Sequence, residues 1–124
     1  DDPDPFLSEA CAGIIDPEDR DPETACRREG EEELGIRVRD MQSIGRVYLC
    51  PGTVTEAITL YLGSYTEADR VSDGGGIDED EDIDVIEMPL AELDRALAHG
   101  GIRDAKLMML VQALKLSKPE LFAD

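Results

Sequence analysis

The chain has 124 residues, enough for one domain with a hydrophobic core. Thirty acidic residues outweigh twelve basic ones, which gives a net charge of −18 at pH 7. This balance argues against binding to nucleic acid or to an anionic membrane, because both need clustered Lys and Arg. No apolar run in the sequence approaches the length of a membrane span.

Residues 1–8 are rich in Pro and Asp and predict a flexible lead-in, followed by one domain over residues 9–124. Residues 9–15 form a short apolar run that fits a buried strand. A helix is predicted to begin at Asp21, because an N-cap Asp followed by Pro is a strong start signal. Gly35 is expected to end that helix in a left-handed turn.

Strands are predicted within residues 38–49, over residues 56–65 and over residues 83–88, with a polar Gly-rich loop over residues 72–82. Two helices follow, because apolar residues recur at helical spacing. Strands interleaved with helices in this way favour an α/β (α+β) fold in which helices cover both faces of a sheet. The apolar positions are Leu90, Leu93 and Leu97 in the first helix, which Gly100 stops, and Leu107, Leu110, Val111 and Leu114 in the second.

Cysteine and histidine usage limits the chemistry further. Cys11, Cys26 and Cys50 form no CxxC motif, and an odd count without a signal-like segment indicates buried thiols in the reducing cytoplasm. His99 is the only histidine, which excludes a zinc site of the HExxH type. No phosphate-binding GxxxxGK loop is present.

The predicted helix after Asp21 carries an unusual acidic cluster. Glu29, Glu32 and Glu33 share one helix face, and like charges at this spacing cost a few tenths of a kcal/mol per pair. A solvated acidic surface is the common meaning of such a run. A bound divalent cation would remove the repulsion, because Mg²⁺ prefers oxygen ligands.

The residues around this cluster resemble the Nudix box, the loop–helix–loop signature of Nudix hydrolases. That pattern is Gly, five residues, Glu, seven residues and then Arg-Glu-apolar-x-Glu-Glu-x-Gly-apolar. The matching residues here are Gly13, Arg28, Glu29, Glu32, Glu33, Gly35 and Ile36.

The sequence departs from the pattern in three places. The gap between Gly13 and Arg28 is one residue longer, and residues 18–20 straddle the place of the first Glu. Both changes fall in a loop, where insertions cost little. The apolar helix position holds Gly30, which costs about 1 kcal/mol of helix stability relative to Ala. We expect Gly30 to loosen the packing of the helix and to leave the acidic site intact.

Segments 49–58, 74–89 and 100–114 extend the resemblance to the nucleoside-diphosphate-sugar branch of the family. It is closest to bacterial GDP-mannose hydrolases, with ADP-ribose pyrophosphatases next. The resemblance implies a mixed β-sheet sandwiched between helices. In the family, further strands precede the box and, in this branch, help to build a homodimer. We therefore expect this chain, which lacks those N-terminal strands, to be the C-terminal portion of a longer protein.

The resemblance also implies roles for individual residues, with Mg²⁺ as the cofactor and Mn²⁺ as an alternative. The metal would be held by the carbonyl of Ala12 and by the carboxylates of Glu29, Glu32, Glu33 and Glu81. The catalytic residues would be Glu79 as the base, Glu32, and Arg28, which orients Glu32. The substrate side would be formed by Pro51, Gly52 and Glu56.

The acidic loop that contains Glu79 and Glu81 does not fit an EF-hand. Counted from Asp78, the required Gly and Glu positions hold Ile83 and Pro89. By composition alone the loop is a solvated acidic segment. Its leading glycines, residues 74–76, have few apolar anchors and predict a mobile loop.

The sequence thus predicts Mg²⁺-dependent hydrolysis of the pyrophosphate of a nucleotide sugar, of the GDP-mannose or ADP-ribose type. The products would be a nucleoside monophosphate and a sugar 1-phosphate. The alternative is a non-catalytic, Nudix-like nucleotide-binding module or an inactive fragment, and Gly30 and the altered first Glu favour it. Metal binding at the box separates these hypotheses.

Overall fold

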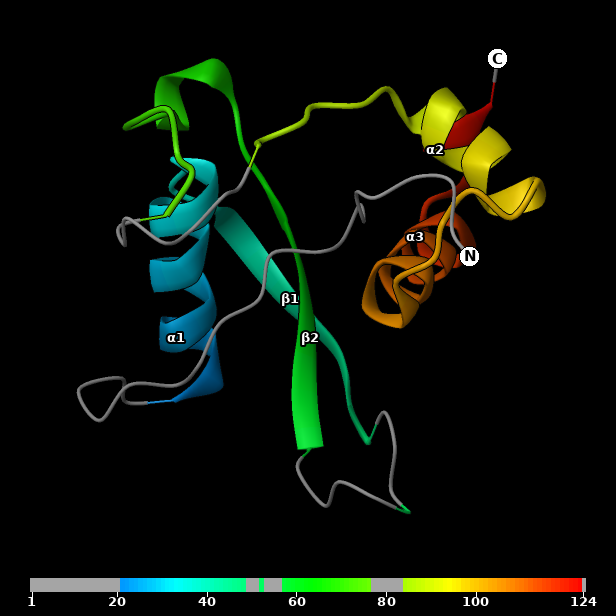
Figure 1. Cartoon of the computed structure of the whole chain (residues 1–124), viewed down its shortest axis with the longest axis horizontal. Helices are drawn as coiled ribbons and strands as arrows, with labels where there is room; N and C mark the ends of the chain where they lie inside the picture. The colour runs from blue at the N-terminus through cyan, green and yellow to red at the C-terminus, as the bar shows by residue number, and fades with distance from the viewer. Residues whose placement is uncertain (1–20, 49–51, 53–56, 77–83, 124) are drawn as a thin grey trace, which may run out of the picture.

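A computed structural model describes residues 21–48, 52, 57–76 and 84–123 (Figure 1). A helix is followed by two strands in its first half, and two further helices lie in its second half. The elements in chain order are α1 (Pro22–Glu29), its π-helical continuation η1 (Gly30–Leu34), β1 (Arg39–Tyr48), β2 (Ala57–Ser64), the turn η2 (Glu67–Asp69), α2 (Leu90–Ala98), α3 (Ala105–Ser117) and the turn η3 (Pro119–Phe122).

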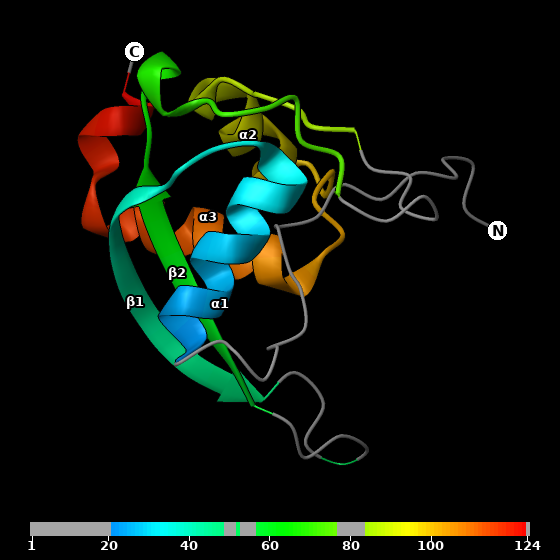
Figure 2. The same ribbon diagram turned by 90° about the vertical axis from the view of Figure 1, so that its left-hand side faces the viewer.

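β1 and β2 pair antiparallel, with Tyr48 opposite Ala57 at one end and Arg39 opposite Ser64 at the other. The register shifts twice within β1, once on each side of Gln42 and Ser43. Such bulges bend a strand and increase its twist. Figure 2 shows the result, a strongly curved ribbon that wraps around α1.

The two strands lie between helices. Figure 1 shows α1 on one face of the ribbon and α3 on the other, and both helices contact β2. The core follows this layering, because Ala25 of α1, Leu60 of β2 and Val111 of α3 are all buried. Within the described residues, the expected sandwich of a sheet between helices is therefore confirmed, with a sheet of two strands.

Most predicted elements are confirmed. The helix begins after Asp21 and ends at Gly35, whose φ of 71° is left-handed. β1 and β2 fall within the predicted strand segments, and α2 and α3 carry the predicted apolar residues. The predicted strand at residues 9–15 and the lead-in lie outside the described residues. In the part of the chain that is described, no helix is both long enough and apolar enough to span a membrane.

The predicted strand over residues 83–88 is wrong for the part that the structure describes, because residues 84–89 form no strand. Side chains hold this segment instead of a backbone ladder. Glu87 accepts a hydrogen bond from Nη2 of Arg70 at 2.9 Å and another from the hydroxyl of Tyr65. Ile86 is 65% exposed and Met88 is 38% exposed, so these two apolar side chains do not face a core.

The expectation that Gly30 loosens the helix is also wrong. Gly30 is buried, and a Cβ at this position would lie 3.4 Å from Cγ2 of Val38 and 3.8 Å from the carbonyl oxygen of Ile36. The helix therefore approaches the chain that leads into β1 closely at this point. The burial of Gly30 contradicts loose packing, and a Cβ here would make only ordinary van der Waals contacts, so the packing does not require a glycine.

Candidate active site

The site is built on the helix formed by α1 and η1. The side chain of Asp21 accepts a hydrogen bond from the backbone amide of Thr24 at 2.8 Å, which caps the first turn. Pro22 at the first helical position lacks an amide, where none is needed. These local signals fix where the helix starts and hence which face Glu29, Glu32 and Glu33 share.

Arg28 binds two of the three glutamates on that face. Its Nη1 lies 2.8 Å from Oε1 of Glu29 and 3.1 Å from Oε2 of Glu32. The three side chains are only 23%, 15% and 25% exposed, in the order Arg28, Glu29 and Glu32. Such partly buried ion pairs are screened less by salt than fully exposed ones.

Glu29 and Glu33 form a pair of carboxyl groups. Burial raises the pKa of Glu29 above its ordinary value of 4.5, and the hydrogen bond and charge of Arg28 lower it. The negative charge of Glu33 and a hydrogen bond to Glu33 raise the pKa again. The Glu33 side chain is therefore close enough for its charge to act on the Glu29 carboxyl group.

The chemistry of this cluster fits a hard divalent cation, because all its donors are carboxylate oxygens. Burial is the main cause of the raised Glu29 pKa and the charge of Glu33 adds to it, and a bound cation would offset both. Within the described residues, no three His, Cys, Asp or Glu side chains are already grouped to hold a metal. Arg28 gives a physical reason, since it holds the carboxylates of Glu29 and Glu32 against its guanidinium.

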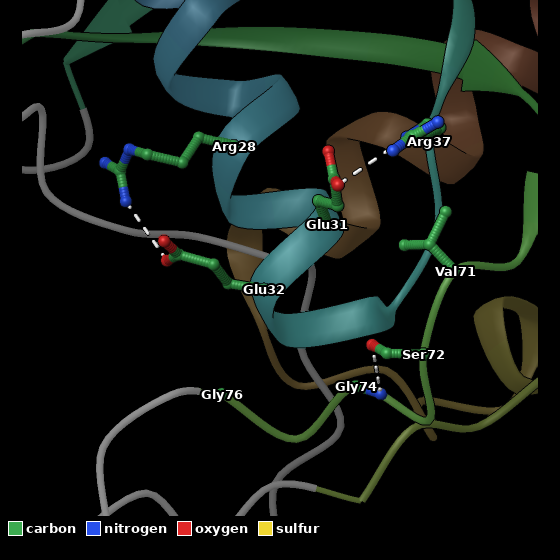
Figure 3. Close-up of a pocket in the computed structure, with 8 residues that line it drawn as sticks. All are labelled: Arg28, Glu31, Glu32, Arg37, Val71, Ser72, Gly74 and Gly76. Atoms are coloured by element: carbon green, nitrogen blue, oxygen red, sulfur yellow. Dashed lines mark hydrogen bonds and ion pairs between the residues drawn. The ribbon is translucent and has the colours of Figure 1, made fainter.

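A cavity of about 810 Å³ opens beside the last turn of this helix (Figure 3). Arg28 and Glu32 point toward one another on one side of the turn, and Glu31 and Arg37 form a second ion pair on the other side, at 3.6 Å. The cavity is thus lined by both positively and negatively charged side chains, which are paired with one another. Its lining residues are Arg28, Glu31, Glu32, Arg37, Val71, Ser72, Gly74 and Gly76.

Residues 74–76, which we call the glycine strap, cross the C-terminal end of this helix. The amide of Gly75 donates to the carbonyl of Glu33 at 2.8 Å, and the amide of Gly76 donates to the carbonyl of Glu32 at 3.0 Å. The expectation of a poorly anchored loop is therefore wrong for these residues. The anchors are backbone groups, which leave no apolar signature in a sequence, and the three consecutive glycines are the one signal that could have indicated them.

The structure brings together Arg28, Glu29, Glu32 and Glu33 of the predicted site. Gly52 lies in a turn. The remaining predicted site residues lie outside the described residues, so their roles stay predictions. They are Ala12, Pro51, Glu56, Glu79 and Glu81.

The family assignment rests on a match over most of the chain. The model of the NUDIX domain matches residues 1–111, which is most of the sequence. The chain therefore belongs to the NUDIX domain family. We call the helix with Arg28 and the three glutamates the box helix, because its sequence resembles the box.

The chain is also similar to individual curated proteins. The chain is 46% identical over 114 residues to a GDP-mannose pyrophosphatase of Cronobacter sakazakii, covering 92% of this chain and 58% of that protein. It is 40% identical over 115 residues to a GDP-mannose pyrophosphatase of an Enterobacter species, covering 93% and 59%. A third GDP-mannose pyrophosphatase, from Salmonella arizonae, is 40% identical over 114 residues, covering 92% and 58%. The chain thus spans somewhat more than half the length of these relatives.

Proposed function

We propose that the protein hydrolyses the pyrophosphate bond of a nucleoside diphosphate sugar, of the GDP-mannose type, with Mg²⁺ as cofactor and Mn²⁺ as a substitute. The observation that carries this proposal is the binding of Glu29 and Glu32 by Arg28, beside Glu33 on the helix whose sequence resembles the family's box. Three relatives named GDP-mannose pyrophosphatase support the choice of substrate.

The glutamates of the box helix would have different roles. Glu29 and Glu33 would hold the metal directly, because they lie four residues apart on one helix face and the charge of Glu33 acts on the Glu29 carboxyl group. Glu32 would become a further metal ligand by rotating away from Arg28. Alternatively, it would keep its hydrogen bond to Arg28 and hold a water molecule bound to the metal. When bound, Mg²⁺ would supply the charge that lets an anionic pyrophosphate approach three carboxylates and would activate water for attack.

In the reaction, the water oxygen forms a bond to one phosphorus, and the bond between that phosphorus and the bridging oxygen breaks. The bridging oxygen leaves with the other phosphate, which gives a nucleoside monophosphate and a sugar 1-phosphate. We assign Glu79 as the base that takes the proton of the water, Glu81 and the Ala12 carbonyl as further metal ligands, and Pro51, Gly52 and Glu56 to the substrate side. The family resemblance supports these assignments.

We further propose that the working unit is a homodimer in the cytoplasm. Within the described residues the sheet has two strands, so each strand has one side whose backbone groups pair with no other described strand. Such edges favour pairing with additional strands. Sedimentation of the full-length protein tests this directly: a dimer is expected, and a fully active monomer would contradict it.

A substrate panel tests the function. The full-length protein is incubated with GDP-mannose, ADP-ribose and nucleoside triphosphates, with Mg²⁺ and with a chelator, and the products are separated by chromatography. We expect GMP and mannose 1-phosphate from GDP-mannose, with Mg²⁺ only. Faster turnover of ADP-ribose would correct the substrate. Release of inorganic pyrophosphate from triphosphates, with no action on nucleotide sugars, would refute the proposal.

A further inference from the structure

The end of the box helix is completed by a segment distant in sequence. The last carbonyls of any helix lack partners within it, and here the Glu32 and Glu33 carbonyls receive the amides of Gly76 and Gly75. Just before the strap, the amide of Val71 donates to the carbonyl of Gly35 at 2.7 Å. Two residues that carry site carboxylates are therefore tied by their backbone to the glycine strap.

The strap needs glycine for its conformation and for its closeness to the helix. Gly74, Gly75 and Gly76 have φ values of 75°, 97° and 92°, a region that other residues rarely adopt. A Cβ on Gly74 would lie 2.5 Å from the Glu33 carbonyl oxygen and 2.7 Å from the carbonyl carbon of Leu34. Both are backbone atoms, so any side chain at Gly74 must displace either the strap or the last helical turn and so disturb the contact between them.

We propose that the glycine strap is a positioning element for the metal centre, which rests on the proposed function. By binding the carbonyls of Glu32 and Glu33, the strap sets the rotation of the last helical turn. That rotation decides whether the Glu33 carboxylate faces Glu29 and whether Glu32 reaches Arg28. The π-helical geometry of η1 makes this turn wider than an α-helix, so its position depends on the tertiary contact more than on the helix itself.

The chain contains a matched control for this inference. Gly100 has the same φ of 75° as Gly74, but a Cβ at Gly100 would meet no atom within 4 Å. Gly74→Ala and Gly100→Ala therefore introduce similar backbone strain, and only the first collides with the box helix. Binding of Mn²⁺ to each full-length variant, followed by electron paramagnetic resonance, reports on the metal centre without requiring turnover.

We expect Gly74→Ala to weaken Mn²⁺ binding about 10- to 100-fold, as loss of support around metal ligands commonly does, and Gly100→Ala to stay within about twofold of wild type. A folded Gly74→Ala variant with wild-type affinity would overturn the proposal. If Gly74→Ala does not fold, Ser72→Ala replaces it. That change removes only the hydroxyl that accepts the Gly74 amide at 3.1 Å, and about threefold weaker binding is expected. Unchanged affinity in Ser72→Ala would then overturn the proposal.

These measurements distinguish a failure of the strap proposal from a failure of the proposed function. Wild-type protein that binds Mn²⁺ but hydrolyses no nucleotide sugar refutes the proposed function, while the variant affinities still decide the role of the strap. If GDP-mannose is hydrolysed and the folded Gly74→Ala variant binds Mn²⁺ with wild-type affinity, the positioning role of the strap is refuted and the proposed function is unaffected.

Discussion

Nη1 of Arg28 lies 3.1 Å from Oε2 of Glu32, one helical turn further along the box helix. The same helix holds a second pair at the same spacing, Glu23 and Arg27, at 3.3 Å. The two pairs differ in burial. Arg27 and Glu23 are 51% and 43% exposed, whereas Arg28 and Glu32 are 23% and 25% exposed. An exposed pair contributes little to stability, so the two arginines should respond very differently to substitution.

Arg28→Gln removes the donor that orients Glu32, and we expect it to lower kcat about tenfold or more and to weaken Mn²⁺ binding. Arg27→Gln should leave both quantities within about twofold of wild type. Steady-state hydrolysis of GDP-mannose and Mn²⁺ titration measure these effects in the full-length protein. Equal effects of the two substitutions would show that Arg28 acts only through helix stability.

Asp69 should contribute to stability against acid. The amide of Thr66 lies 2.7 Å from its Oδ2, and that hydrogen bond, followed by the bond and charge of Arg39, lowers the Asp69 pKa below its ordinary value of 3.8. A lowered carboxyl pKa stabilises the fold above about pH 4, and this stabilisation is lost as the pH falls through the lower, folded-state pKa. The free energy of unfolding should therefore fall less steeply in this range for Asp69→Asn than for wild type.

Urea denaturation at a series of pH values between about 2 and 6 measures this slope. Asp84→Asn, a substitution of an exposed aspartate, is the matched control and should follow wild type. Identical slopes for Asp69→Asn and wild type would show that the Thr66 and Arg39 hydrogen bonds do not stabilise the fold in solution.

The catalytic base is predicted at Glu79 from the sequence resemblance. Glu79→Gln should lower turnover by about 10²–10⁴-fold with little change in metal affinity, because removal of a general base slows only the chemical step. Glu81→Gln should in addition weaken metal binding in the substrate complex. Turnover and Mn²⁺ affinity of each variant measure both effects. If both substitutions are silent and Glu56→Gln abolishes turnover, the base is Glu56.

The sequence predicts the box helix well because both of its ends are set by residues close to them in sequence. Asp21 caps its own helix through Thr24, and Gly35 adopts the left-handed turn that few other residues permit. The acidic face follows from helical spacing alone. That spacing also predicts the relation of Arg28 to Glu32, and the alternation of apolar residues predicts the strand β2.

The errors share one cause, which is tertiary contact. The apolar alternation of residues 83–88 indicates a strand, but Glu87 is bound by the side chains of Tyr65 and Arg70, which no local pattern reveals. Gly30 has a poor helix propensity, yet it is buried, because the chain that leads into β1 packs against it. The glycine strap lacks apolar anchors, but its partners are carbonyls distant in sequence.

The central claim is that the carboxylates of the box helix bind a catalytic metal. The most direct test is Mn²⁺ titration of full-length wild type, Glu33→Gln and Glu23→Gln, with Mg²⁺-dependent hydrolysis of GDP-mannose measured on the same samples. Glu23→Gln removes a carboxylate of the exposed pair on the same helix and serves as the control. We predict that wild type and Glu23→Gln bind the ion and turn over, whereas a folded Glu33→Gln loses nearly all hydrolysis and binds the ion at least about tenfold more weakly. Wild-type turnover in Glu33→Gln would contradict the metal assignment, and absence of metal binding in wild type would favour a non-catalytic binding module.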